Sequence, residues 1–161
     1  TGLLYVRKNK IEKIWPLMAA EKTLATDIRK FEEIGTHSAG PRLAIGEAIL
    51  FYNGIGAKRK EARLRYLARY WMNRLKELPN VAFHTSFDER QSCAIATVEI
   101  KGIEPPALSG YLMDKKKIFT TTISNDAFKG IRITPNVYTT LPELDRFCET
   151  METIARKGLP K

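Results

Sequence analysis

The chain has 161 residues, of which 43% are hydrophobic and 28% are charged, and its formal net charge is +9. These values are typical of a folded globular protein of one domain or slightly more, and they exclude a disordered or low-complexity chain. No apolar run has membrane-spanning length, so we expect no membrane contact. Two cysteines without metal-ligand spacing favour a reducing, cytoplasmic location.

The first 40 residues contain few regular elements. Residues 1–7 predict a strand, and the next three residues a turn. Residues 11–16 predict a short helical turn that ends at a proline, and residues 17–30 have no clear period. Because the chain opens directly in a strand-like run without methionine, we expect it to be a piece of a longer protein.

Two helices are predicted next. The helix at residues 41–52 has apolar side chains on two neighbouring stripes, which indicates burial on two sides. The helix at residues 57–78 places Leu67, Trp71 and Leu75 at helical spacing, which predicts a core stripe with Trp71 as a packing anchor. This second helix also carries much of the positive charge.

The basic face of helix 57–78 has two interpretations. A run of charges is usually a solvated surface, and a nucleic-acid-binding surface is the alternative. No zinc module and no RNA-binding sheet with exposed aromatic residues accompanies it. We therefore do not expect a nucleic-acid partner, but a basic α+β binding module remains the alternative function.

The second half of the chain alternates between strands and helices. Strands are predicted at residues 81–85, 93–100, 118–123 and around 131–133, and helices from residues 105 and 141. The resulting order predicts an α+β fold, with a small antiparallel-rich sheet and helices on one face.

Residues 130–140 carry the most specific pattern. Ile131 and Ile133 alternate with Arg132, which predicts a short strand with buried isoleucines and an exposed arginine. Thr140 and Glu143 have the spacing of a helix capping box. An arginine fixed on a strand either forms a surface salt bridge or binds a planar anion such as a carboxylate.

The cysteines and histidines give weaker signals. Cys93 in a predicted strand and Cys148 in a predicted helix are interpreted as core thiols. His37, a lone histidine, is more often a polar contact at a helix start than a catalytic residue, and His84 in a predicted strand is favoured still less for catalysis.

The segment GIRITPNVYTT at residues 130–140, followed by LPELDRF, resembles the C-terminal signature of class V aminotransferase-fold enzymes. These are fold type I enzymes that use pyridoxal 5'-phosphate, and they include cysteine desulfurases, kynureninases and isopenicillin N epimerase-like proteins. The resemblance implies that Arg132 binds the α-carboxylate of an amino-acid substrate. It also implies that Thr36 in the Gly35-Thr36 stretch, presented from the neighbouring subunit, binds the cofactor phosphate. Alternatively, Thr36 or Ser38 only caps the following helix.

The same resemblance implies a domain organisation. Residues 1–40 would be the tail end of a large cofactor-binding domain, residues 41–56 an inter-domain helix, and residues 57–161 the C-terminal small domain. The enzyme would be a homodimer with a shared active site, and the missing N-terminal part would include the Schiff-base lysine just upstream of Thr1. We therefore expect this piece to be inactive by itself.

The type of reaction is left open by the resemblance. Desulfurases place a nucleophilic cysteine on a loop shortly before the carboxylate-binding arginine, and residues 113–125 contain none. Desulfuration by that route is therefore not expected. Residues 136–140 are closer to the isopenicillin N epimerase-like branch, and an epimerase, transaminase or lyase reaction at the α-carbon would fit.

Overall fold

A computed structural model describes residues 2–160. The chain divides into two compact units, one up to Gly54 and one from Ile55 onward, and each is described by itself. Within residues 2–160, no helix is long and apolar enough to cross a membrane.

The first unit is built from short 3-10 helices and one long helix. The 3-10 helices are η1 (Lys8–Lys13), η2 (Lys22–Leu24) and η3 (Ile28–Glu32), and the long helix is α1 (Gly40–Ile55). Lys30 is buried, and its ammonium group donates to the backbone carbonyls of Ile11 and Ala25. This lysine therefore joins η3 to η1 and to the segment between η2 and η3.

The predicted strand at residues 1–7 is wrong for the described residues 2–7, and Thr1 lies outside them. Leu3 and Tyr5 are each 87% exposed. A strand needs a neighbouring strand to satisfy its N–H and C=O groups, and no described segment pairs with these residues. An apolar pattern alone is not sufficient to form a strand.

Helix α1 differs from the prediction in its environment. None of its residues is buried, and Leu43 and Phe51 are 72% and 69% exposed. The predicted burial on two sides is therefore not met within residues 2–160. A helix that is apolar around most of its circumference is normally covered by other protein.

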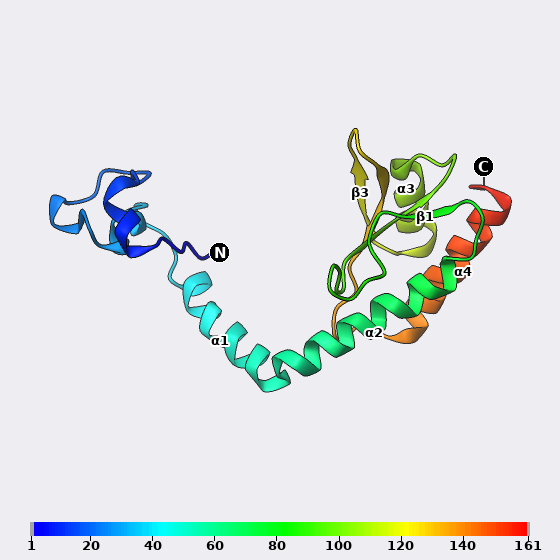
Figure 1. Cartoon of the computed structure of the whole chain (residues 1–161), viewed down its shortest axis with the longest axis horizontal. Helices are drawn as coiled ribbons and strands as arrows, with labels where there is room; N and C mark the ends of the chain where they lie inside the picture. The colour runs from blue at the N-terminus through cyan, green and yellow to red at the C-terminus, as the bar shows by residue number, and fades with distance from the viewer. Residues whose placement is uncertain (1, 161) are drawn as a thin grey trace. The chain divides into compact units, whose positions relative to one another are not determined.

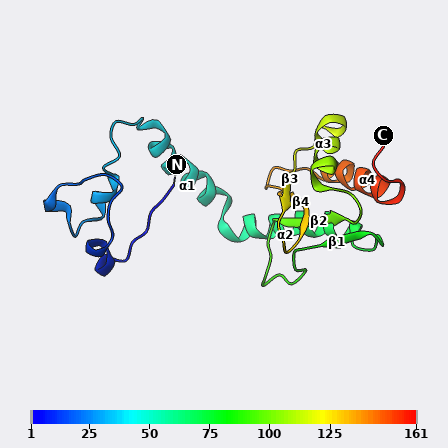
Figure 2. The ribbon, with the colours of Figure 1, turned by 90° about the horizontal axis from the view of Figure 1, so that it is seen from above.

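The second unit is an α+β layer, as predicted. Its elements are α2 (Ala57–Leu75), β1 (Val81–Phe83), β2 (Ala96–Ile100), α3 (Pro105–Lys116), β3 (Thr121–Ser124), β4 (Lys129–Ile133) and α4 (Leu141–Lys157). The four strands form one sheet in the order β1-β2-β4-β3, and every neighbouring pair is antiparallel (Figures 1 and 2).

The core lies between one face of this sheet and the three helices. Buried residues of β2 and β4 form a single cluster with buried residues of α2, α3 and α4. Trp71 is fully buried, and its ring lies 5.6 Å from the rings of both Phe83 and Phe147. The predicted core stripe of α2 is confirmed, since Leu67 and Leu75 are also buried.

Two strands begin later than predicted. Strand β2 begins at Ala96, so Cys93 lies in an exposed bend and is not a core thiol. The carbonyl of the preceding Ser92 accepts a hydrogen bond from the Arg65 side chain instead of from a neighbouring strand. Strand β3 begins at Thr121, because the Thr120 carbonyl accepts a hydrogen bond from Ser109 of α3.

Candidate functional site

Arg132 lies near the end of strand β4 on the face opposite the core. It stands opposite Thr97 of β2 and Thr121 of β3, while its neighbours Ile131 and Ile133 are buried. Alternation along the strand therefore turns the guanidinium group away from the helices, as predicted.

The Arg132 side chain has no strong partner among residues 2–160. Its Nη2 atom lies 3.5 Å from the Thr121 hydroxyl, and no described carboxylate lies within ion-pair distance. The salt bridge that was one of the two predicted alternatives is thus not observed. The planar donor fork remains available to a carboxylate or a similar anion.

The chain that follows β4 is held in one geometry. The Thr139 N–H donates to the Asn136 carbonyl at 2.8 Å, and the Asn136 N–H donates to the Thr139 hydroxyl at 3.0 Å. Arg63 of α2 then donates to the Thr139 carbonyl at 2.9 Å. This turn is closed on itself and tied to α2, so the end of β4 is fixed.

The predicted capping box begins helix α4. The Thr140 N–H and hydroxyl group both donate to Glu143 at 2.8 Å. These hydrogen bonds to Thr140 lower the pKa of Glu143. The box therefore joins the turn after β4 to the first turn of α4.

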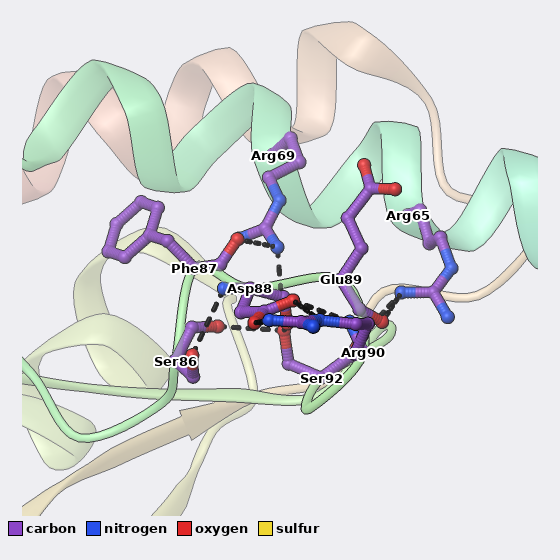
Figure 3. Close-up of polar contacts among 8 residues, drawn as sticks. All are labelled: Arg65, Arg69, Ser86, Phe87, Asp88, Glu89, Arg90 and Ser92. Atoms are coloured by element: carbon purple, nitrogen blue, oxygen red, sulfur yellow. Dashed lines mark hydrogen bonds and ion pairs between the residues drawn. The ribbon is translucent and has the colours of Figure 1, made fainter.

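Two further arginines of α2 hold the loop between β1 and β2 (Figure 3). Arg65 donates to the Glu89 carbonyl at 2.6 Å and to the Ser92 carbonyl at 2.5 Å, and Arg69 donates to the Phe87 carbonyl at 2.5 Å. The Arg69 guanidinium also lies 5.4 Å from the centre of the Phe87 ring. The loop backbone is thus fixed from one side by α2.

Most arginine side chains of α2 donate hydrogen bonds to other groups of the second unit. Besides the three arginines already described, Arg74 donates to Glu152 at 2.6 Å and to Asp145 at 3.1 Å. The hydrogen bond to Glu152 raises the pKa of Arg74. Arginines committed to carbonyls and carboxylates of their own unit are less available to phosphates, so these contacts do not favour the nucleic-acid alternative.

The Gly35-Thr36 stretch lies in the first unit, just before α1. Gly35 has φ +79°, a conformation that favours glycine. Ser38 accepts a hydrogen bond from the Gly40 N–H at 3.3 Å, whereas the exposed Thr36 hydroxyl has no hydrogen-bond partner among residues 2–160. The capping alternative therefore applies to Ser38, and the Thr36 hydroxyl is free for another partner.

The residues around Thr36 fit a phosphate group chemically. Arg42 in the first turn of α1 adds a positive charge, and the Thr36 hydroxyl can donate a hydrogen bond. Beside them is a hollow of about 350 Å³ whose lining includes His37, Arg42 and Ile45. His37 Nδ1 lies 3.0 Å from the Gly35 carbonyl, which orients its ring next to this stretch.

The structure also pairs two residues that the sequence analysis did not connect. His84 Nε2 lies 2.7 Å from Glu99 Oε2, and the His84 ring stacks on Phe128 at 4.8 Å with an angle of 24°. Histidine and glutamate are 15 residues apart, so only the register of β1 and β2 brings them together.

The cysteines and metal-binding residue types add little to the candidate site. Burial raises the pKa of the Cys148 thiol to about 12, so it is not a nucleophile at neutral pH, and Cys93 is exposed. Within residues 2–160 no three histidine, cysteine or acidic residues come together as a metal site.

The comparisons with known proteins agree with this fold. The sequence model of the family described as aminotransferase class-V matches residues 1–146, and this chain belongs to that family. Class V aminotransferases use pyridoxal phosphate, and the α+β fold of the second unit agrees with the fold of these enzymes. No curated protein sequence matches the chain significantly.

Solved structures with the same fold include a cysteine desulfurase from Thermococcus onnurineus NA1, with 21% identity and a TM-score of 0.70 over 81% of this chain and 34% of that chain. An alanine–glyoxylate aminotransferase from Nostoc sp. has 16% identity and a TM-score of 0.60 over 83% of this chain and 38% of that chain. A cystine C-S lyase, solved with its product cysteine persulfide, has 19% identity and a TM-score of 0.59 over 76% of this chain and 31% of that chain. The chain spans about a third of the length of these proteins.

Proposed function

We propose that this chain is part of a pyridoxal-phosphate-dependent enzyme that acts at the α-carbon of an amino-acid substrate, and that Arg132 binds the substrate α-carboxylate. The reaction would be of the epimerase, transaminase or lyase type, with the isopenicillin N epimerase-like branch as the nearest resemblance. The observation that carries the proposal is the exposed Arg132 guanidinium, which is fixed on a central strand without a carboxylate partner among the described residues.

Arg132 would fix the orientation of the substrate. Two parallel N–H groups of the guanidinium fork can donate to the two carboxylate oxygens, which sets the direction of the bonds at the α-carbon. The Thr121 hydroxyl lies beside the fork, and the Arg63 contact holds the chain just after the strand. When bound, pyridoxal phosphate withdraws electrons from the α-carbon and so makes its bonds easier to break.

We propose that Thr36, together with the backbone at Gly35, binds the cofactor phosphate in the active site of the neighbouring subunit. The free Thr36 hydroxyl and the positive charge of Arg42 support this role. That Thr36 serves the active site of the neighbouring subunit is inferred from the resemblance to class V aminotransferases.

The uncovered apolar surface of the first unit supports a larger assembly. Leu43 and Phe51 of α1 and Leu3 before η1 are all more than two-thirds exposed. We propose that the large domain and a second subunit cover them in a homodimer, with residues 1–40 belonging to the large domain and residues 41–56 joining the domains. The lysine that binds the cofactor covalently is proposed to lie upstream of Thr1, so residues 1–161 alone would be inactive.

The test uses the protein extended upstream beyond the proposed lysine. Its absorbance spectrum should show a band at roughly 400–430 nm that borohydride bleaches, as expected for pyridoxal phosphate bound to a lysine. Arg132→Ala should keep this band but raise KM for the amino-acid substrate about 10- to 100-fold, because charged hydrogen bonds are lost. Arg59→Ala, on the exposed surface of α2, is the matched control. Unchanged kinetics in Arg132→Ala would contradict the proposed role.

A further inference from the structure

A row of four residues crosses the exposed face of the sheet. The His84 N–H donates to the Thr97 carbonyl at 3.0 Å, which extends the pairing of β1 with β2 by one residue. Thr97 stands opposite Arg132, and Arg132 stands opposite Thr121. Residues directly opposite each other in antiparallel strands share a face of the sheet, so His84 and Arg132 are on the same face, two strands apart. This separation is roughly 10 Å between their Cα atoms.

His84 is held in a fixed orientation on this face. Its Nε2 contacts Glu99, and Phe128 stacks against its ring. Phe128 is itself placed by the β3–β4 hairpin, where Asn125 Oδ1 accepts hydrogen bonds from the N–H groups of Ala127 and Phe128. About a quarter of each of the His84 and Glu99 side chains is exposed, and the His84 Nδ1 atom has no hydrogen-bond partner among residues 2–160.

Gly130 and the Thr97 side chain lie between Arg132 and Glu99 on this face. Gly130 is two residues before Arg132 on β4 and, by the register of β2 and β4, it stands opposite Glu99. A Cβ atom at this position would lie 2.7 Å from the Val98 carbonyl oxygen, so the backbones are too close here for any larger residue. Arg132 and the pair of His84 and Glu99 therefore lie on the same face of the sheet, separated by Thr97 and Gly130.

We propose that His84 and Glu99 form a subsite for the far end of the substrate side chain, while Arg132 holds the α-carboxylate. This inference rests on the proposed function of Arg132. The free imidazole nitrogen and the second Glu99 oxygen accept hydrogen bonds, and Glu99 adds negative charge. The subsite therefore selects amino acids whose side chain ends in a hydrogen-bond donor, above all an ammonium group, and rejects those that end in a carboxylate.

The alternative is a cross-strand pair that only supports the sheet. Partly exposed pairs of this kind stabilise a protein only weakly and need no ligand. The two interpretations differ in one measurable property, because only a subsite makes ligand affinity depend on the ligand side chain through Glu99.

The experiment is an NMR titration of the 161-residue chain with L-lysine, L-norleucine and L-glutamate, followed through the backbone amides of β2 and β4. We expect L-lysine to bind about 5- to 10-fold more tightly than L-norleucine, and L-glutamate to bind most weakly. Glu99→Gln should remove the difference between L-lysine and L-norleucine. Glu104→Gln, which removes an exposed carboxylate paired with Lys129 outside this row, should preserve it.

The outcomes separate this inference from the proposed function. Equal binding of the three amino acids, with affinity lost in Arg132→Ala but unchanged in Glu99→Gln, would overturn the subsite and leave the role of Arg132 intact. Unchanged binding of all three in Arg132→Ala would contradict the role of Arg132, and the subsite with it.

Discussion

Arg63 of α2 donates to the backbone carbonyl of Thr139 at 2.9 Å, although the two residues are 76 positions apart in the sequence. Thr139 belongs to the turn that follows Arg132 on strand β4. A residue from the basic helix therefore fixes the segment next to the proposed carboxylate site. The positive charge of Arg63, which the sequence alone places on a basic helix, thus stabilises a turn of its own unit.

The first prediction concerns this contact. Arg63→Met should lower the free energy of unfolding by about 1–2 kcal/mol, because the Thr139 carbonyl loses a charged donor. Chemical denaturation followed by far-UV circular dichroism measures the change.

Arg59→Met is the matched control for Arg63, because it removes the same group from the same helix. Arg59 is exposed and its side chain has no hydrogen bond, ion pair or ring contact within residues 2–160, so its loss should change the free energy of unfolding by less than about 0.5 kcal/mol. Equal effects of the two substitutions would show that the Thr139 contact contributes nothing.

A second prediction concerns Gly130 on the sheet. An added Cβ atom would lie 2.7 Å from the Val98 carbonyl oxygen and 3.0 Å from the Thr97 methyl group. Gly130→Ala should therefore destabilise the protein by about 1–3 kcal/mol or more, because a rigid backbone atom must move. The midpoint of thermal unfolding measures the effect.

Gly110→Ala, within α3, is the control for Gly130→Ala, because a Cβ atom at Gly110 has free space around it. Nothing lies within 4 Å of a Cβ atom there, and alanine is the better helix former. We expect a gain of about 0.5–1 kcal/mol. A destabilisation as large as that of Gly130→Ala would contradict the packing difference between the two glycines.

The two cysteines should differ in reactivity. Cys93 is exposed in a bend, whereas Cys148 is fully buried in α4 with a pKa raised to about 12 by burial. At pH 8 a thiol reagent should therefore modify Cys93 rapidly and Cys148 only on unfolding. Mass spectrometry of the labelled peptides identifies each position, and Cys93→Ser should abolish the rapid phase.

The raised pKa of Cys148 also predicts a pH dependence of stability. An unfolded cysteine loses its proton near pH 8.5, whereas the folded one keeps it up to about 12. The neutral thiol therefore contributes stability that is complete below pH 8.5 and is lost as the pH rises towards 12. The difference in unfolding free energy between the wild type and Cys148→Ala should narrow over this range. A constant difference would show that the thiol titrates normally in the folded protein.

The last prediction concerns the link between α2 and α4. Arg74 donates through Nε and Nη2 to the two oxygens of Glu152, a bidentate pair that is about one-third exposed. A double-mutant cycle with Arg74→Met and Glu152→Gln should give a coupling free energy of about 1 kcal/mol. High salt should reduce it only slightly, because the pair is in direct contact. A coupling free energy near zero would show that the pair is only a loose surface contact.

The sequence by itself predicted the α+β class, the strand that carries Arg132 and the capping box at Thr140. These features are local, since they follow from alternation along one strand and from the spacing of two residues in one helix turn. It also identified the buried stripe of α2 with Trp71, because helical spacing places those residues on one side. Gly35 and Thr36 were found only through their resemblance to a family motif, and their role stays a prediction.

Tertiary structure decided what depends on contacts between distant segments. The apolar start of the chain, residues 2–7, does not form a strand because a strand needs a partner, and Cys93 lies outside β2 because Arg65 takes the Ser92 carbonyl. The register of three strands places His84 in line with Arg132, and no spacing in the sequence reveals it. Long-range pairing of this kind is set by the packing of the whole sheet, whereas local patterns only determine which residues face the core.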